Sequence, residues 1–85
     1  MAISISRTPL WCLLQQRANN MPSLKELLRA DPQRFTHFSA SACGMLLDYS
    51  KQRMDTTAKL NLLALARQQE VESRRDAMLR GEAIN

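Results

Sequence analysis

Apolar residues recur every three or four positions over residues 9–20, which predicts an amphipathic helix at the start of this chain. Thr8 can cap this helix, and Pro9 suits its first position, where no amide partner is required. The residues expected on one face are Leu10, Leu14, Ala18 and Met21, with Trp11 and Leu13 at its edges.

A second, shorter helix is predicted to begin after Ser23. Ser23 and Glu26 have the spacing of a capping box, in which the hydroxyl accepts an amide proton and the carboxylate reaches back. The buried face is expected to carry Leu24, Leu27 and Leu28. Asp31-Pro32 should then cap and start one more helical turn through Phe35.

The helical period breaks between Asp31 and Lys51, and we predict a short two-stranded ribbon over residues 36–50. Small residues from Ser39 to Gly44 supply a turn signal between apolar and aromatic residues. Those flanking residues are Phe35, Phe38, Met45, Leu46, Leu47 and Tyr49. We expect the helices on either side to pack on this ribbon.

A third long helix is predicted over residues 56–69, with Asp55 or Thr56 as its N-terminal cap. Its apolar stripe comprises Ala58, Leu62, Leu65 and Ala66. Leu60 and Leu63 fall outside that stripe. Because a helix that is apolar on more than one side is usually covered on more than one side, these two leucines indicate missing partner surface.

A fourth helix is expected over residues 71–80, ending at Gly81, which adopts a left-handed conformation at little cost. Its inward residues are expected to be Val71, Ala77, Met78 and Leu79. The predicted fold is therefore mainly α, with about four helices and a short β-ribbon near residues 36–50. With 85 residues, the chain is one domain at most and only marginally able to fold alone, or it is one piece of a larger protein.

The net charge of +4 comes from 12 basic and 8 acidic residues. The basic residues are dispersed, which favours a solvated mixed-charge surface over a nucleic-acid site. Cys12 and Cys43 lack metal-ligand spacing; a disulfide between them stays open, but reduced thiols are favoured. Leu10–Leu14 is too short and broken for a signal peptide or membrane helix, so we expect a cytoplasmic chain.

Candidate chemistry is sparse. His37 has no aspartate, serine or cysteine at a spacing that implies a proton relay, so a structural or surface role is favoured. Asp48, Tyr49, Ser50 and Lys51 offer varied groups, but a strand would point Asp48 and Ser50 one way and Tyr49 and Lys51 the other. Glu82 and Asn85 could belong to a site only if more chain followed. We expect no catalytic, substrate-binding, cofactor-binding or metal-binding residue.

Several motifs follow one another over nearly the whole chain: Trp11 and Leu14; Leu27-Leu28; Asp31-Pro32; Arg34-Phe35; Phe38-Ser39; Leu46 through Lys51; Leu62, Leu65-Ala66 and Val71; and Met78 through Asn85. Together and in this order, they resemble the N-terminal segment of the glucose-6-phosphate isomerase family. Gln52 replaces the family's Asn, Leu79 its Phe and Ala83 its Lys. These departures concern packing and surface.

The resemblance implies a peripheral helical segment, residues 1–85, of an α/β sugar-isomerase (SIS-type) enzyme, with the catalytic domains absent. The family interconverts glucose 6-phosphate and fructose 6-phosphate in glycolysis and gluconeogenesis, as a dimer and without a metal or organic cofactor. Its catalytic His and Glu and its phosphate loops have no match here, and His37 does not correspond to the catalytic His. The implied partner is the remainder of the isomerase chain, not nucleic acid or a membrane.

Two alternatives stay open from the sequence. One is an independent, small, basic helical module that binds a protein or nucleic acid. The other is a truncated or pseudogene-like product of a gene for a catalytic enzyme.

Overall fold

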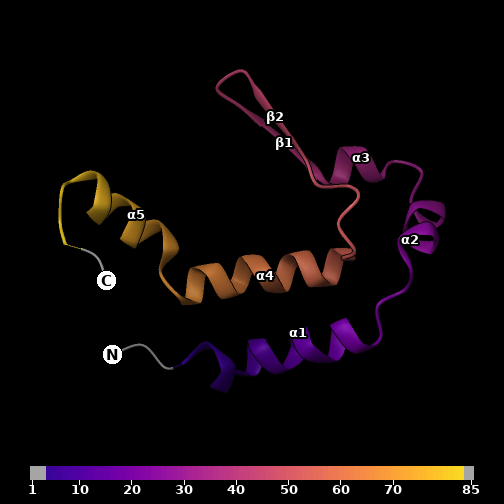
Figure 1. Ribbon diagram of the computed structural model, residues 1–85, viewed down its shortest axis with the longest axis horizontal. Helices are drawn as coiled ribbons and strands as arrows, with labels where there is room; N and C mark the ends of the chain where they lie inside the picture. The colour runs from indigo at the N-terminus through magenta and orange to yellow at the C-terminus, as the bar shows by residue number, and fades with distance from the viewer. Residues whose placement is uncertain (1–3, 84–85) are drawn as a thin grey trace. The chain divides into compact units, whose positions relative to one another are not determined.

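The computed structural model describes residues 4–83, which form two units (Figure 1). One unit is Asn20–Asp55, with helices α2 (Leu24–Ala30) and α3 (Arg34–His37) and strands β1 (Ser39–Ala42) and β2 (Met45–Asp48). The other comprises the described residues on either side of it: a 3-10 turn (η1, Ile5–Arg7), α1 (Pro9–Asn19), α4 (Thr56–Gln68) and α5 (Val71–Leu79). A mainly helical chain with one short ribbon is confirmed.

Helix α1 begins as its sequence predicts. The Thr8 side chain is buried, and its Oγ1 accepts the Trp11 amide at 3.3 Å while donating to the Ile5 carbonyl at 2.8 Å. This hydroxyl therefore caps α1 and fastens η1 to it, because it satisfies one free amide of the first turn.

Helices α1 and α4 pack side by side and run in opposite directions, as the ribbon in Figure 1 shows. Ala58 is buried in α4, and small size at this position lets the helices approach closely. The predicted stripes are partly right: Leu10, Leu14, Leu65 and Ala66 are half-buried. Ala18 and Leu62 are exposed instead, and Met21 lies beyond the end of α1.

Helix α5 ends at Gly81, as predicted. Gly81 has a φ of +84°, its amide donates to Met78, and the Glu82 amide donates to Ala77, which is the Schellman arrangement. The predicted inward face of α5 is wrong, however, since Val71, Met78 and Leu79 are exposed and only Ala77 is half-buried. Periodicity marks an apolar side, but a surface must be present to cover it.

Helix α2 carries the predicted cap. The Ser23 hydroxyl accepts the Glu26 amide at 3.2 Å and donates to the Glu26 carboxylate at 3.1 Å. Leu27 is buried and Leu24 half-buried, whereas Leu28, expected inside, is exposed.

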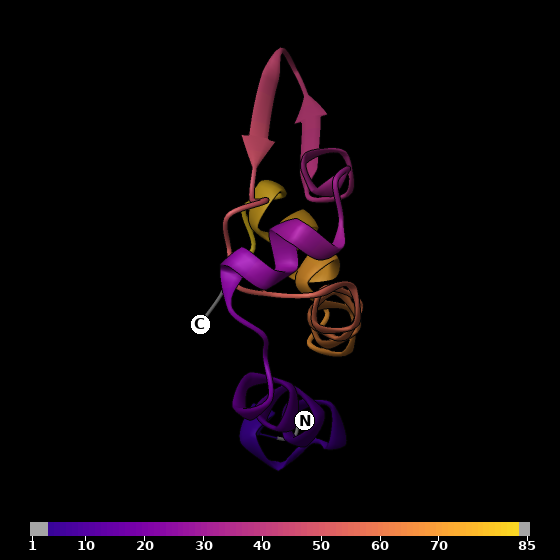
Figure 2. The same cartoon turned by 90° about the vertical axis from the view of Figure 1, so that its right-hand side faces the viewer.

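The ribbon is an antiparallel hairpin, shown as two arrows in Figure 2, in which Ala42 pairs with Met45 and Ser39 with Asp48. Cys43 and Gly44 form its turn with φ values of +52° and +74°. Positive φ at both central residues is characteristic of the type I′ turn, whose twist matches that of the strands. The two-residue loop therefore fixes the register.

The ribbon is shorter than predicted, because its first expected residues belong to α3. Asp31 Oδ1 accepts the Gln33 amide, and α3 runs on to His37 instead of ending near Phe35. Helices α2 and α3, which belong to the same unit, do not cover the strand side chains as expected: Met45, Leu46 and Leu47 are 71%, 59% and 63% exposed. Phe38 alone among the described aromatics is fully buried.

Candidate functional site

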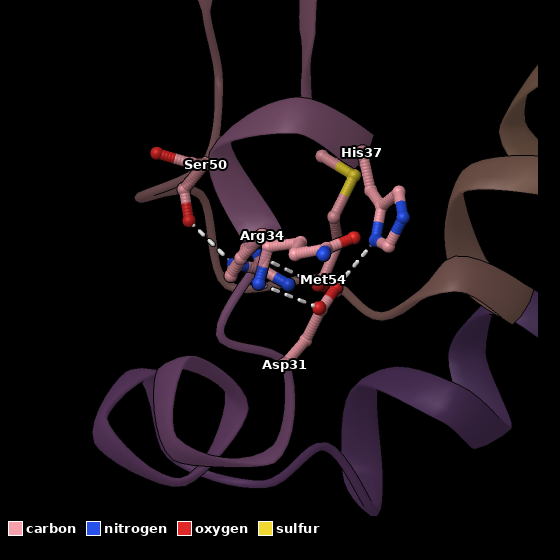
Figure 3. A network of polar contacts seen from close by, with 6 residues as sticks. Asp31, Arg34, His37, Ser50 and Met54 are labelled. Carbon is pink, nitrogen blue, oxygen red and sulfur yellow. Dashed lines mark hydrogen bonds and ion pairs between the residues drawn. The ribbon is translucent and has the colours of Figure 1, made fainter.

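The best-organised polar cluster among the described residues surrounds Arg34 (Figure 3). This side chain is only 3% exposed. Its Nε donates to the Ser50 carbonyl at 2.5 Å, and one Nη donates to the carbonyls of Gln52 at 2.7 Å and Met54 at 2.9 Å. A buried guanidinium requires such acceptors, because its donors lose their water on burial.

An aromatic pair completes the surroundings of Arg34. Arg34 and Phe38 are four residues apart, so the turn of α3 places both on one side. The ring of Tyr49 meets that of Phe38 edge-on, with centroids 5.7 Å apart, and the Tyr49 amide donates to the Phe38 carbonyl. The base of the ribbon is thereby joined to α3.

A second arginine, Arg53, also donates hydrogen bonds to backbone carbonyls, here at the start of the unit. Arg53 Nε donates to the Pro22 carbonyl at 2.9 Å, and its Nη2 donates to that of Met21 at 2.6 Å. Arg34 and Arg53 thus bind the backbone carbonyls of two connecting segments, residues 50–54 and residues 21–22. Groups already bonded in this way are directed at the chain itself rather than at a ligand.

His37 lies on the surface and pairs with Asp31, whose Oδ2 is 2.6 Å from the ring Nδ1. This hydrogen bond is the main cause that lowers the pKa of Asp31 below its ordinary value of 3.8. The pair stabilises the turn that leads into α3. A histidine and a carboxylate alone lack the nucleophile that a catalytic triad requires.

The Asp48–Lys51 stretch differs from its prediction. The strand ends at Asp48, and the chain then turns, so that Asp48 Oδ1 accepts both the amide of Ser50 at 2.9 Å and its hydroxyl at 2.7 Å. These bonds, the hydroxyl first, lower the pKa of Asp48. Asp48 and Ser50 therefore meet in a turn, not on one face of a strand, and Lys51 stays exposed.

The remaining candidates do not converge. Glu82 pairs with Arg80 at 2.7 Å, whereas Asn85 lies outside the described residues. Cys12 and Cys43 are free and exposed. Within residues 4–83, no group of three His, Cys, Asp or Glu side chains could hold a metal ion, and no described helix is long and apolar enough to cross a bilayer.

The sequence interpretation missed both structural arginines. Their carbonyl partners are 16 to 32 residues away along the chain, and no local sequence motif indicates such hydrogen bonds. One signal was available: Arg34 precedes Phe38 by four residues, which allows the two side chains to stack if the helical turn extends beyond Phe35.

Comparison with known proteins gives a consistent result. The chain is 45% identical over 75 residues to a glucose-6-phosphate isomerase of Shewanella loihica, 42% over 82 residues to one of Shewanella oneidensis, and 40% over 81 residues to one of Shewanella amazonensis. These matches cover 88%, 95% and 95% of this chain, but only 14% to 15% of the relatives. No protein-family model matches the chain.

Proposed function

Because this chain is homologous over most of its length to the glucose-6-phosphate isomerases, we propose that it forms the N-terminal segment of such an enzyme. The segment serves as a scaffold that packs on the catalytic domains. The complete enzyme interconverts glucose 6-phosphate and fructose 6-phosphate, acts as a cytoplasmic dimer and uses no cofactor. The observation that carries the proposal is 45% identity over 75 residues, a span equal to only 14% of the relative.

The contacts support a structural role for the segment. Arg34 and Arg53 donate hydrogen bonds to backbone carbonyls of this chain. The Ser50 hydroxyl donates to the carboxylate of Asp48, in the turn that follows the ribbon. Such groups shape the chain, whereas a catalytic group must be free to meet its substrate. We therefore assign no catalytic or substrate-binding residue to residues 1–85, and expect the chain alone to be inactive.

A chimera tests this proposal. This chain would replace the matching 75 residues of the Shewanella loihica enzyme, and the conversion of fructose 6-phosphate to glucose 6-phosphate would be measured. The chimera should be active, while the same enzyme without the segment and this chain alone should not. An inactive, folded chimera would contradict the assignment, and isomerisation by the chain alone would contradict its scaffold role.

The alternative of an independent nucleic-acid module is not favoured. The guanidinium groups of Arg34 and Arg53 bind carbonyls, and those of Arg75 and Arg80 pair with Asp76 and Glu82. These four arginines are engaged within the chain, and the other basic residues are dispersed along the sequence rather than gathered in one cluster. A titration with duplex DNA at low salt discriminates, since a phosphate-binding protein would show steep salt dependence.

A further inference from the structure

We propose that one face of the β1–β2 ribbon, formed by Ala40, Ala42, Met45 and Leu47, docks on an apolar surface of the remaining isomerase polypeptide. This inference rests on the proposed function and specifies where the segment meets its partner. We call these four residues the docking face.

The register of the hairpin defines the docking face. Ala42 pairs with Met45 and Ala40 with Leu47. Directly paired residues of an antiparallel ribbon lie on the same face, and alternate residues of each strand share it. All four members of the docking face are therefore apolar.

The opposite face is different in chemistry. It carries the pairs Ser39–Asp48 and Ser41–Leu46, so three of its four residues are polar. A hairpin with one apolar and one mainly polar face is typical of strands that bury one side and expose the other to water. The polarity thus predicts which side of the ribbon is covered.

The exposed fractions show how much apolar surface lacks a cover. Met45 is 71% exposed and Leu47 63%. An open, mainly apolar hollow is lined by the four residues of the docking face together with Ser41 and Leu46 of the opposite face. Large side chains this exposed on neighbouring positions mark an interaction surface more often than a free one.

The ribbon is also held in shape before any partner binds. Its turn has the backbone conformation that suits a hairpin, and its base is joined to α3 through Phe38 and Tyr49. A pre-formed surface loses less conformational entropy on binding than a flexible one.

The sequence matches indicate the occupant. About 85% of the length of the relatives lies outside the matched segment, although the matched segment covers most of this chain. In those relatives both parts belong to one polypeptide, which gives the segment a partner at a high effective concentration. Since the docking face carries no charge, the surface that receives it should be apolar as well.

Cysteine labelling in the chimera described above tests the docking face. Leu47→Cys reports on the docking face and Ser41→Cys on the opposite face, in a background with Cys12→Ser, Cys43→Asn and no other accessible cysteine. In the isolated chain both reporters should react at similar rates with a maleimide. In the chimera, Leu47→Cys should react about tenfold or more slowly, because labelling then requires local opening, whereas Ser41→Cys should not slow.

Equal labelling of the two reporters in an active chimera would overturn the docking face while leaving the proposed function intact. If the chimera is inactive while the maleimide still labels Leu47→Cys slowly, the isomerase role is contradicted instead, and the docking face is not. Met45→Cys, on the same face, replaces Leu47→Cys if that variant misfolds. Protection in the isolated chain that grows with its concentration would identify a second copy as the occupant and overturn the proposal.

Discussion

The guanidinium carbon of Arg34 lies 4.0 Å from the centroid of the Phe38 ring. This stacking occupies one face of a cation whose edges bind three backbone carbonyls. A cation over an aromatic ring gains about 0.5–2 kcal/mol, depending on how far both are removed from water. The stacking lies within α3 and its C-terminal cap, whereas the carbonyl bonds join α3 to the segment that follows the ribbon. Arg34 and Phe38 are both almost completely buried.

Replacement of Arg34 should loosen residues 50–54. Arg34→Lys keeps the charge but cannot reach three carbonyls and stack at once, because an ammonium lacks the planar fork. We expect a loss of roughly 2 kcal/mol, or about 30-fold faster amide exchange at Gln52 and Met54. Arg29→Lys, at an exposed position of α2, is the matched control. Unchanged exchange in Arg34→Lys would show that the carbonyl bonds do not stabilise this segment.

The Thr8 hydroxyl should be needed for the start of α1. Thr8→Val keeps the shape of the buried side chain but removes its bonds to Trp11 and Ile5. The expected cost is about 1 kcal/mol, the usual effect of losing a helix cap. Amide exchange in the first turn of α1 measures it. Thr8→Ser, which retains the hydroxyl, should lose far less, and equal losses in the two variants would contradict a capping role.

The turn of the ribbon should respond to substitution at Cys43. Cys43→Asn creates the Asn-Gly pair that type I′ turns prefer and should raise the hairpin population by roughly 0.5 kcal/mol. Cys43→Val should lower it by about 1–2 kcal/mol, since a β-branched residue is strained at a φ of +52°. Chemical shifts of β1 and β2 report the population. Equal hairpin populations in Cys43→Val and Cys43→Asn would contradict this prediction.

Acid should weaken the turns around Asp31 and Asp48. Both carboxyl groups have a pKa below 3.8 in the folded chain, so their contribution to stability is present above pH 3.8 and is lost as pH falls through the lowered pKa. Side-chain NMR titration should give midpoints below 3.8 for both groups. His37→Ala should raise the midpoint of Asp31 and leave that of Asp48 unchanged. Midpoints at or above 3.8 in the unsubstituted chain would refute the assigned hydrogen bonds.

The isolated chain should unfold over a broad temperature range. The sequence offers no evident partner for four apolar residues, Leu60, Leu63, Leu79 and Ile84. The first three are exposed, and Ile84 lies outside the described part of the chain. Circular dichroism of a monomeric sample measures the transition. A sharp, cooperative melt would contradict the prediction of marginal order.

The sequence alone was sufficient to predict most of the helix caps and helix ends. The turn expected over Ser39–Gly44 is confined to Cys43 and Gly44, because Ser39–Ala42 form β1. The caps at Thr8 and Ser23 and the stop at Gly81, by contrast, were predicted and are present. Each depends on hydrogen bonds or backbone angles within a few residues, so the order of residues is sufficient to specify it. The same locality explains why the helices appear at nearly their predicted positions.

The tertiary structure decided the long-range contacts and the burial. The sequence did not predict that Arg34 and Arg53 would bind distant carbonyls, because backbone acceptors look alike at every position. Nor did it predict that Val71 and Met78 would be exposed, since periodicity identifies an apolar face but not the surface that covers it. Short-range hydrogen bonds are encoded where they form, whereas burial depends on what else is folded alongside.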